Sequence, residues 1–181
     1  MTTSQLILMT TLYLAIFVGV AYLTRARVPR IAGALGAGAV FGVIALFALA
    51  LGETQGWWRV PKTGSSHFQL LLWIGLAVSC APVYLITWRV ARRFGGLGLA
   101  VFALAAVLIG PARDYLVAAA FPDWIAFSPR IAPVLAIATI YALLVVVGHA
   151  VMRIVAGPAQ GDSFARRLSG AGKNSAASKL P

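Results

Sequence analysis

The polar residues best placed for chemistry gather between positions 111 and 130. Arg113, Asp114 and Tyr115 are consecutive there, and Asp123 and Arg130 follow them. An arginine binds anionic groups through several N–H donors, and a nearby aspartate accepts hydrogen bonds. The segment could therefore form the mouth of a pocket or a surface that docks a partner. Alternatively, its charges only order a loop, because adjacent Arg and Asp side chains in a helix point about 100° apart and pair elsewhere.

A second polar pair, Tyr141 and His149, lies in an apolar stretch near the end of the chain. The two residues are about two helical turns apart, so both would lie on one face of a helix. This face could line a quinone site or carry protons, or His149 could be a neutral histidine bonded to a neighbouring helix. His67, the other histidine, is expected at the opposite membrane face. A haem held by two histidines is therefore not expected, and we predict no cofactor.

Few side chains remain for catalysis. The chain has four acidic residues, two histidines and one cysteine, and it contains no P-loop, HExxH, GxSxG or dinucleotide-binding motif. Cys80 cannot form an intrachain disulfide, and no Cys/His spacing is typical of a metal site. We therefore predict no metal and favour a protein that is not an enzyme. The sequence leaves its biochemical activity open.

The elements that position these residues must be membrane helices. Of 181 residues, 61% are hydrophobic and only 10% are charged, and the mean hydropathy is +0.91. Soluble domains have about 45–50% apolar and about 25% charged residues. This composition indicates membrane helices, and the length corresponds to one domain. We therefore predict an all-α, polytopic integral membrane protein.

Five stretches are candidates for transmembrane helices, since a helix needs about 20 apolar residues to cross a bilayer. They cover residues 6–23, 31–52, 68–88, 96–110 and 131–152. The fourth is short, and it either ends at Gly110 or continues, kinked at Pro111, to residue 121; the kinked helix is favoured. Residues 1–157 would thus form a five-helix domain. Residues 158–181 would form a basic, partly disordered cytoplasmic tail.

The positions of the basic residues predict the orientation of the chain. Most lie beside the membrane on one side, and cytoplasmic segments carry such an excess. This side holds Arg25, Arg27, Arg30, Arg89, Arg92, Arg93, Arg153, Arg166, Arg167, Lys173 and Lys179. The N-terminus is therefore predicted outside and the C-terminus inside. The net charge of +11 is then a membrane signal and does not indicate nucleic-acid binding. Abundant Ala and Gly, with Arg in place of Lys, suggest a bacterial plasma (inner) membrane.

Small residues recur every fourth position in the second span, at Ala34, Gly38 and Gly42. Such a face allows another helix backbone to approach closely. Packing within the bundle is favoured over a homodimer, which stays possible.

Three functions are compatible with these observations. The leading hypothesis is a small, non-enzymatic subunit or scaffold of a membrane complex, with other membrane-protein subunits and the lipid bilayer as partners. The alternative is an enzyme or carrier that acts on a lipid-like or anionic substrate at the extracytoplasmic face. A weaker alternative is a quinone-linked redox subunit.

Overall fold

The computed structural model describes residues 2–60 and 66–157 of the chain. The predicted tail, 158–181, lies outside the described residues. Within the described part the fold is helical apart from two strands of two residues each. The elements are α1 (Thr3–Leu23), α2 (Val28–Thr54), β1 (Trp58–Arg59), α3 (Ser66–Ala120), β2 (Ala126–Phe127) and α4 (Ile131–Ala156). The predicted all-α class is confirmed.

Each of these four helices is long and apolar enough to cross a membrane. The shortest, α1, has 21 residues and is therefore about 30 Å long, which matches the hydrocarbon core of a bilayer. Many large apolar side chains are exposed on the bundle, for example Leu8 in α1, Phe47 in α2 and Leu108 in α3. A surface of this kind is suited to lipid and not to water.

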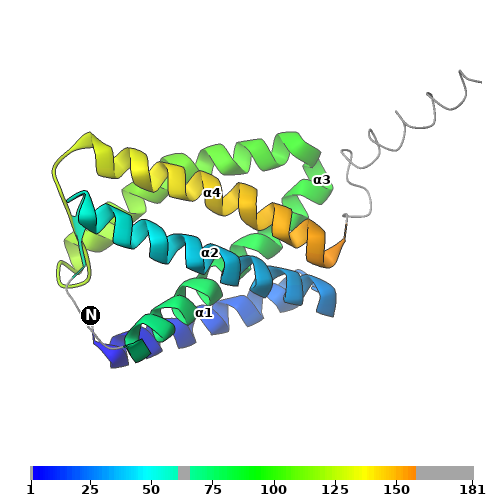
Figure 1. Ribbon diagram of the computed structural model, residues 1–181. Helices are drawn as coiled ribbons and strands as arrows, with labels where there is room; N and C mark the ends of the chain where they lie inside the picture. The colour runs from blue at the N-terminus through cyan, green and yellow to red at the C-terminus, as the bar shows by residue number, and fades with distance from the viewer. Residues whose placement is uncertain (1, 61–65, 158–181) are drawn as a thin grey trace, which may run out of the picture.

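Helix α3 is interrupted at Gly95. This residue has φ 66° and ψ −153°, which are not helical values, and a positive φ is tolerated best by glycine because it has no side chain. In Figure 1 the green helix α3 bends sharply at one end of the molecule and returns toward the other. Its 55 residues would extend about 80 Å if straight. The bend divides them into two halves, 66–94 and 96–120, and the second half continues through Pro111 to Ala120.

The small face of α2 packs against α3 of the same chain. A side chain on Gly38 would collide with the backbone carbonyl of Ala77, and Gly42 lies beside the ring of Trp73. The Trp73 indole N–H donates a hydrogen bond of 3.2 Å to the carbonyl of Ala39. Ala34 is fully buried in the same core. Close packing of the backbones therefore uses the small residues that recur in this span.

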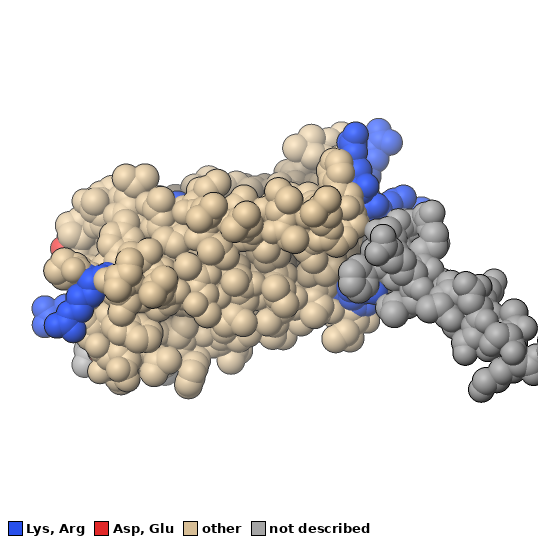
Figure 2. Space-filling model, turned by 90° about the horizontal axis from the view of Figure 1, so that it is seen from above, with Lys and Arg blue, Asp and Glu red and all other residues tan. Residues whose placement is uncertain are grey.

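The two ends of the bundle differ in their connections. The α1–α2 turn, the bend of α3 and the end of α4 lie at one end (Figure 1). At the other end β1 pairs antiparallel with β2, and Trp58 is opposite Phe127. Figure 2 shows Lys and Arg side chains mainly at the two ends, with an uncharged band between them.

Candidate functional site

An apolar cavity of about 380 Å³ lies between the helices. All four helices contribute to its wall, and most of the lining side chains are aliphatic or aromatic. They include Phe41 and Ala45 of α2, Leu76, Val83 and Phe102 of α3, and Ile137, Ile140 and Leu144 of α4. Ser79 and Cys80 are small polar exceptions on the α3 side. A cavity of this size and composition suits an apolar ligand or the apolar part of one.

Four polar side chains form a hydrogen-bonded network at this cavity. Arg113 donates from Nη1 to the hydroxyl of Tyr141 over 3.1 Å and from Nη2 to the hydroxyl of Tyr13 over 3.3 Å. The Tyr141 hydroxyl donates in turn to Oδ1 of Asp114 over 3.0 Å. All four residues line the cavity. The network thus joins α1, α3 and α4 at the one strongly polar part of the wall.

The local sequence explains how Tyr141 reaches Arg113 and Asp114. Gly110 lies one helical turn before this pair, and a side chain there would overlap the Tyr141 ring. The absence of a side chain lets the ring lie directly against the α3 backbone. The next residue, Pro111, is buried in the helix. Gly110 is therefore the residue that permits α4 to place a hydroxyl beside the arginine.

The network lies well inside the ends of the helices. Arg113 is about 10 Å before the end of α3, and Tyr13 and Tyr141 are each about 15 Å beyond the starts of α1 and α4. These helix ends all lie at the end of the bundle that carries β1 and β2 (Figure 1). A charged pair at this depth is costly in hydrocarbon unless its groups are well bonded.

The arginine keeps part of its hydrogen-bonding capacity. The shortest distance between Arg113 and Asp114 in their ion pair is 3.8 Å, which is too long for a hydrogen bond. Asp114 is bonded to Tyr141 instead, and 56% of the Arg113 side chain is exposed. Because its two tyrosine partners engage only some of its N–H groups, the guanidinium can donate to a further acceptor.

Two aromatic side chains cover the cavity at the β1–β2 end. Trp58 and Phe127 meet edge to face with ring centres 6.1 Å apart, and both line the cavity. The Trp58 indole donates to the carbonyl of Leu49 over 3.0 Å. Gly52 leaves the space that the indole occupies, since a side chain there would overlap it. The short strand pair therefore holds an aromatic cover over the apolar cavity.

The structure brings together only some of the candidate residues. Arg113, Asp114 and Tyr141 share the network, whereas the Tyr115 ring stacks on Phe127 at 4.6 Å. The Tyr115 hydroxyl is buried and has no partner among the described residues.

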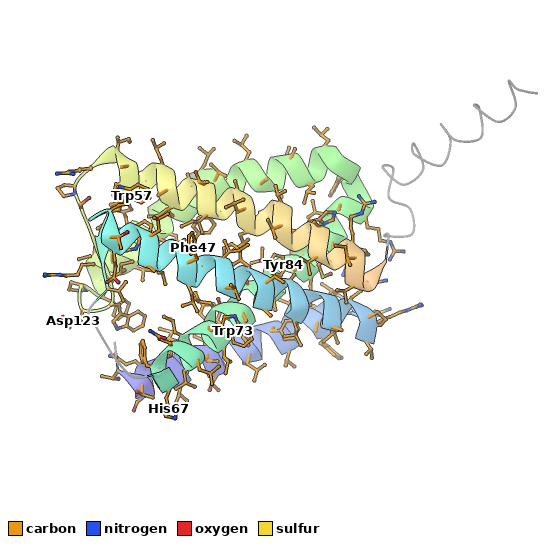
Figure 3. All side chains as sticks on the ribbon, in the orientation of Figure 1. Phe47, Trp57, His67, Trp73, Tyr84 and Asp123 are labelled. Atoms are coloured by element: carbon orange, nitrogen blue, oxygen red, sulfur yellow. The ribbon has the colours of Figure 1, made fainter. Side chains whose placement is uncertain are left out.

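Asp123 and Arg130 are exposed in the connection between α3 and α4. Figure 3 shows Asp123 at the end of the molecule, away from the interior of the bundle. His149 is buried and lies beside Trp88, with ring centres 6.1 Å apart. It is about 12 Å along α4 from Tyr141. The two residues therefore belong to different parts of the bundle.

Tyr13, Trp58 and Phe127 could not be identified as parts of this site from the sequence. Tyr13 was recognisable only as a hydroxyl in an apolar span, at a depth similar to that of Tyr141. The contribution of Trp58 and Phe127 depends on the pairing of two-residue strands, which are too short to give a hydrophobic pattern.

Comparison with models of protein families, with curated proteins and with solved structures yields no match. Within residues 2–60 and 66–157, no group of three or more His, Cys, Asp and Glu side chains is arranged to hold a metal ion.

Proposed function

We propose that the protein binds an amphipathic, lipid-like molecule inside its helix bundle. The apolar part of the ligand occupies the cavity, and an anionic headgroup accepts hydrogen bonds from Arg113. The observation that carries this proposal is Arg113, whose side chain is 56% exposed, at a mostly apolar cavity of about 380 Å³.

The hydrogen-bond pattern supports an acceptor headgroup. Asp114 is engaged by Tyr141, so its negative charge helps to hold the network while the guanidinium retains donors. A carboxylate or phosphate ester oxygen is a strong acceptor for these donors. Charge-assisted hydrogen bonds of this kind are worth about 1.5–3 kcal/mol each. The acyl chain of such a molecule matches the apolar wall.

We also propose that the chain crosses the membrane five times. Each half of α3 is long enough to cover the roughly 30 Å of a bilayer core, so the Gly95 bend would make a hairpin of two spans. The bend, the α1–α2 turn and the end of α4 carry Arg25, Arg89 and Arg153 with other arginines. The positive-inside rule then puts this end in the cytoplasm and the Arg113 network in the outer half of a bacterial inner membrane.

A role as a subunit of a membrane complex is the second candidate, and α1 favours it. This helix packs mainly on α3, and only Leu6 and Phe17 among its residues are buried. The exposed side chains of α1 include Leu8, Leu12 and Val18, and they form an apolar surface that a partner helix or a second copy of the chain could cover. Stoichiometric co-purification of another membrane protein would support this role.

Lipid extraction after purification in a mild detergent tests the leading proposal. Mass spectrometry of the extract from the wild-type protein should identify an enriched amphipathic molecule. The extract from Arg113→Gln should contain at least tenfold less of this molecule. Arg130→Gln is the matched control, because it changes an exposed arginine at the same end of the bundle, and its extract should contain as much as that of the wild-type protein. Equal recovery from all three proteins would contradict the proposal.

A further inference from the structure

A second cleft, of about 390 Å³, opens at the end of the bundle opposite the aromatic cover. We call it the arginine cleft, because its lining includes Arg30 of α2 and Arg89, Arg92 and Arg93 of α3. The cleft lies between the start of α2 and the last turns of α3 before the Gly95 bend. Figure 2 shows Lys and Arg side chains gathered at this end. The cleft is separate from the cavity beside Arg113.

The positive charges in the arginine cleft are not balanced by carboxylates in the described part of the chain. The acidic residues of that part are Glu53, Asp114 and Asp123, and they lie toward the other end of the bundle. Arg30 is repelled by Arg92 and Arg89, which share the cleft, and by nearby Arg27. Like charges that share one cleft repel each other, and an anion between them would offset this repulsion.

Two of the four arginines are held by contacts of their guanidinium groups. The Arg89 guanidinium donates to the backbone carbonyl of Leu23 over 3.4 Å, in the last turn of α1, where carbonyl groups lack helical partners. The Arg93 guanidinium lies over the Phe94 ring at 5.4 Å. Arg30 and Arg92 have no such contact in the described part, and both line the cleft.

The floor of the cleft is apolar. Leu85 and Trp88 line it and are only 2% and 4% exposed. A cluster of arginines above an apolar floor has the same arrangement of charge as the membrane boundary, where lipid headgroups lie above acyl chains. Anionic headgroups attract basic side chains at this boundary. A phosphate ester that carries acyl chains would satisfy both parts of the cleft, whereas a free phosphate ion would satisfy only the arginines.

We propose that the arginine cleft binds the phosphate headgroup of an anionic phospholipid. Arg30 and Arg92 make the principal contacts with the phosphate oxygens, in the bidentate manner that guanidinium groups favour. Leu85 and Trp88 form the apolar base of the cleft below the headgroup. This site does not depend on the ligand proposed for the Arg113 cavity.

Native mass spectrometry of the full-length chain in a neutral detergent tests the site. The protein is titrated with phosphatidylglycerol, phosphatidylcholine or sodium phosphate. Arg113→Gln serves as the background throughout, so that binding at the cavity does not contribute. The cleft variant is Arg30→Gln with Arg92→Gln. The matched control removes two arginines from the opposite end, with Arg59→Gln and Arg130→Gln. All proteins must first show the same elution volume and helical circular dichroism.

We expect phosphatidylglycerol to bind the background protein and the matched control equally. The cleft variant should bind it at least tenfold more weakly. Equal affinity in the cleft variant would overturn the proposal. Phosphatidylcholine binding as tightly as phosphatidylglycerol would show that no anionic lipid is required, and sodium phosphate binding as tightly would assign the cleft to a free anion; either result also overturns it.

Discussion

The hydroxyl of Tyr141 donates a hydrogen bond of 3.0 Å to the carboxylate of Asp114, across the interface between α4 and the second half of α3. The same hydroxyl accepts from Arg113. One phenol therefore separates the two charges of an ion pair and connects both to α4. Asp114 therefore has its hydrogen bond from the phenol, and the N–H groups of Arg113 that do not bond to Tyr13 or Tyr141 remain available to a ligand.

Removing this hydroxyl should destabilise the protein. Tyr141→Phe leaves the partly buried Asp114 without its donor, which costs about 1–3 kcal/mol for an unsatisfied polar group. We expect a lower midpoint of thermal unfolding, measured in detergent. Tyr22→Phe is the matched control, because Tyr22 is 82% exposed. The loss of stability caused by Tyr141→Phe should be smaller in an Asp114→Asn background than in the wild-type protein. Equal losses in the two backgrounds would show that Tyr141 and Asp114 are not energetically coupled.

A pair of glycines in α2 tests the close approach of α2 to α3. Gly38→Ala should destabilise the bundle by about 1–3 kcal/mol, because the added methyl group meets the Ala77 carbonyl and the backbone cannot move away cheaply. Gly36→Ala adds the same group where nothing lies within 4 Å. It should leave stability unchanged or slightly raised. The midpoint of thermal unfolding is measured for both variants. Equal destabilisation by Gly38→Ala and Gly36→Ala would show that the contact with the Ala77 carbonyl is not its cause.

Cysteine labelling in intact cells tests the proposed orientation. In a Cys80→Ser background, Asp123→Cys should react with a membrane-impermeant thiol reagent. Arg93→Cys, near the Gly95 bend, should react only after the membrane is permeabilised. The reverse pattern would show the opposite orientation. Labelling of both positions from outside would contradict a hairpin of two spans in α3.

The membrane class followed from composition, because long apolar stretches with few charges allow few alternatives to helices. The sequence predicted two separate spans, 68–88 and 96–110, with arginines between them, whereas in the structure the two are halves of α3 that meet at the Gly95 bend. The continuation through Pro111 was harder to judge. A proline removes one helical hydrogen bond but does not dictate whether neighbouring helices support the turn.

The candidate site was predictable only in part. Arg113 and Asp114 stood out as charges beside an apolar span, and Tyr141 as a polar residue within one. Their meeting depends on the register of α4 against α3, which Gly110 sets by leaving room for a ring. Helical periodicity placed Tyr141 and His149 on one face, but it gives no information on which neighbour each residue meets. The role of Trp58 required the β1–β2 pairing, which is a long-range contact.

Cys80 provides a probe inside the proposed binding cavity. It is the only cysteine of the chain, it lines the cavity, and it is 7% exposed. A ligand chain in the cavity should therefore shield its thiol from a small, membrane-permeant reagent. No engineered cysteine is needed for this measurement.

The most direct test is the rate of Cys80 alkylation by N-ethylmaleimide in phosphatidylcholine vesicles, with dodecanoate as the amphipathic probe and dodecanol as its uncharged counterpart. We predict that dodecanoate slows alkylation of the wild-type protein several-fold, that dodecanol has a much smaller effect, and that Arg113→Gln loses the protection by dodecanoate. An unchanged rate in the wild-type protein, or equal protection in Arg113→Gln, would contradict binding of an anionic amphipathic ligand in the cavity.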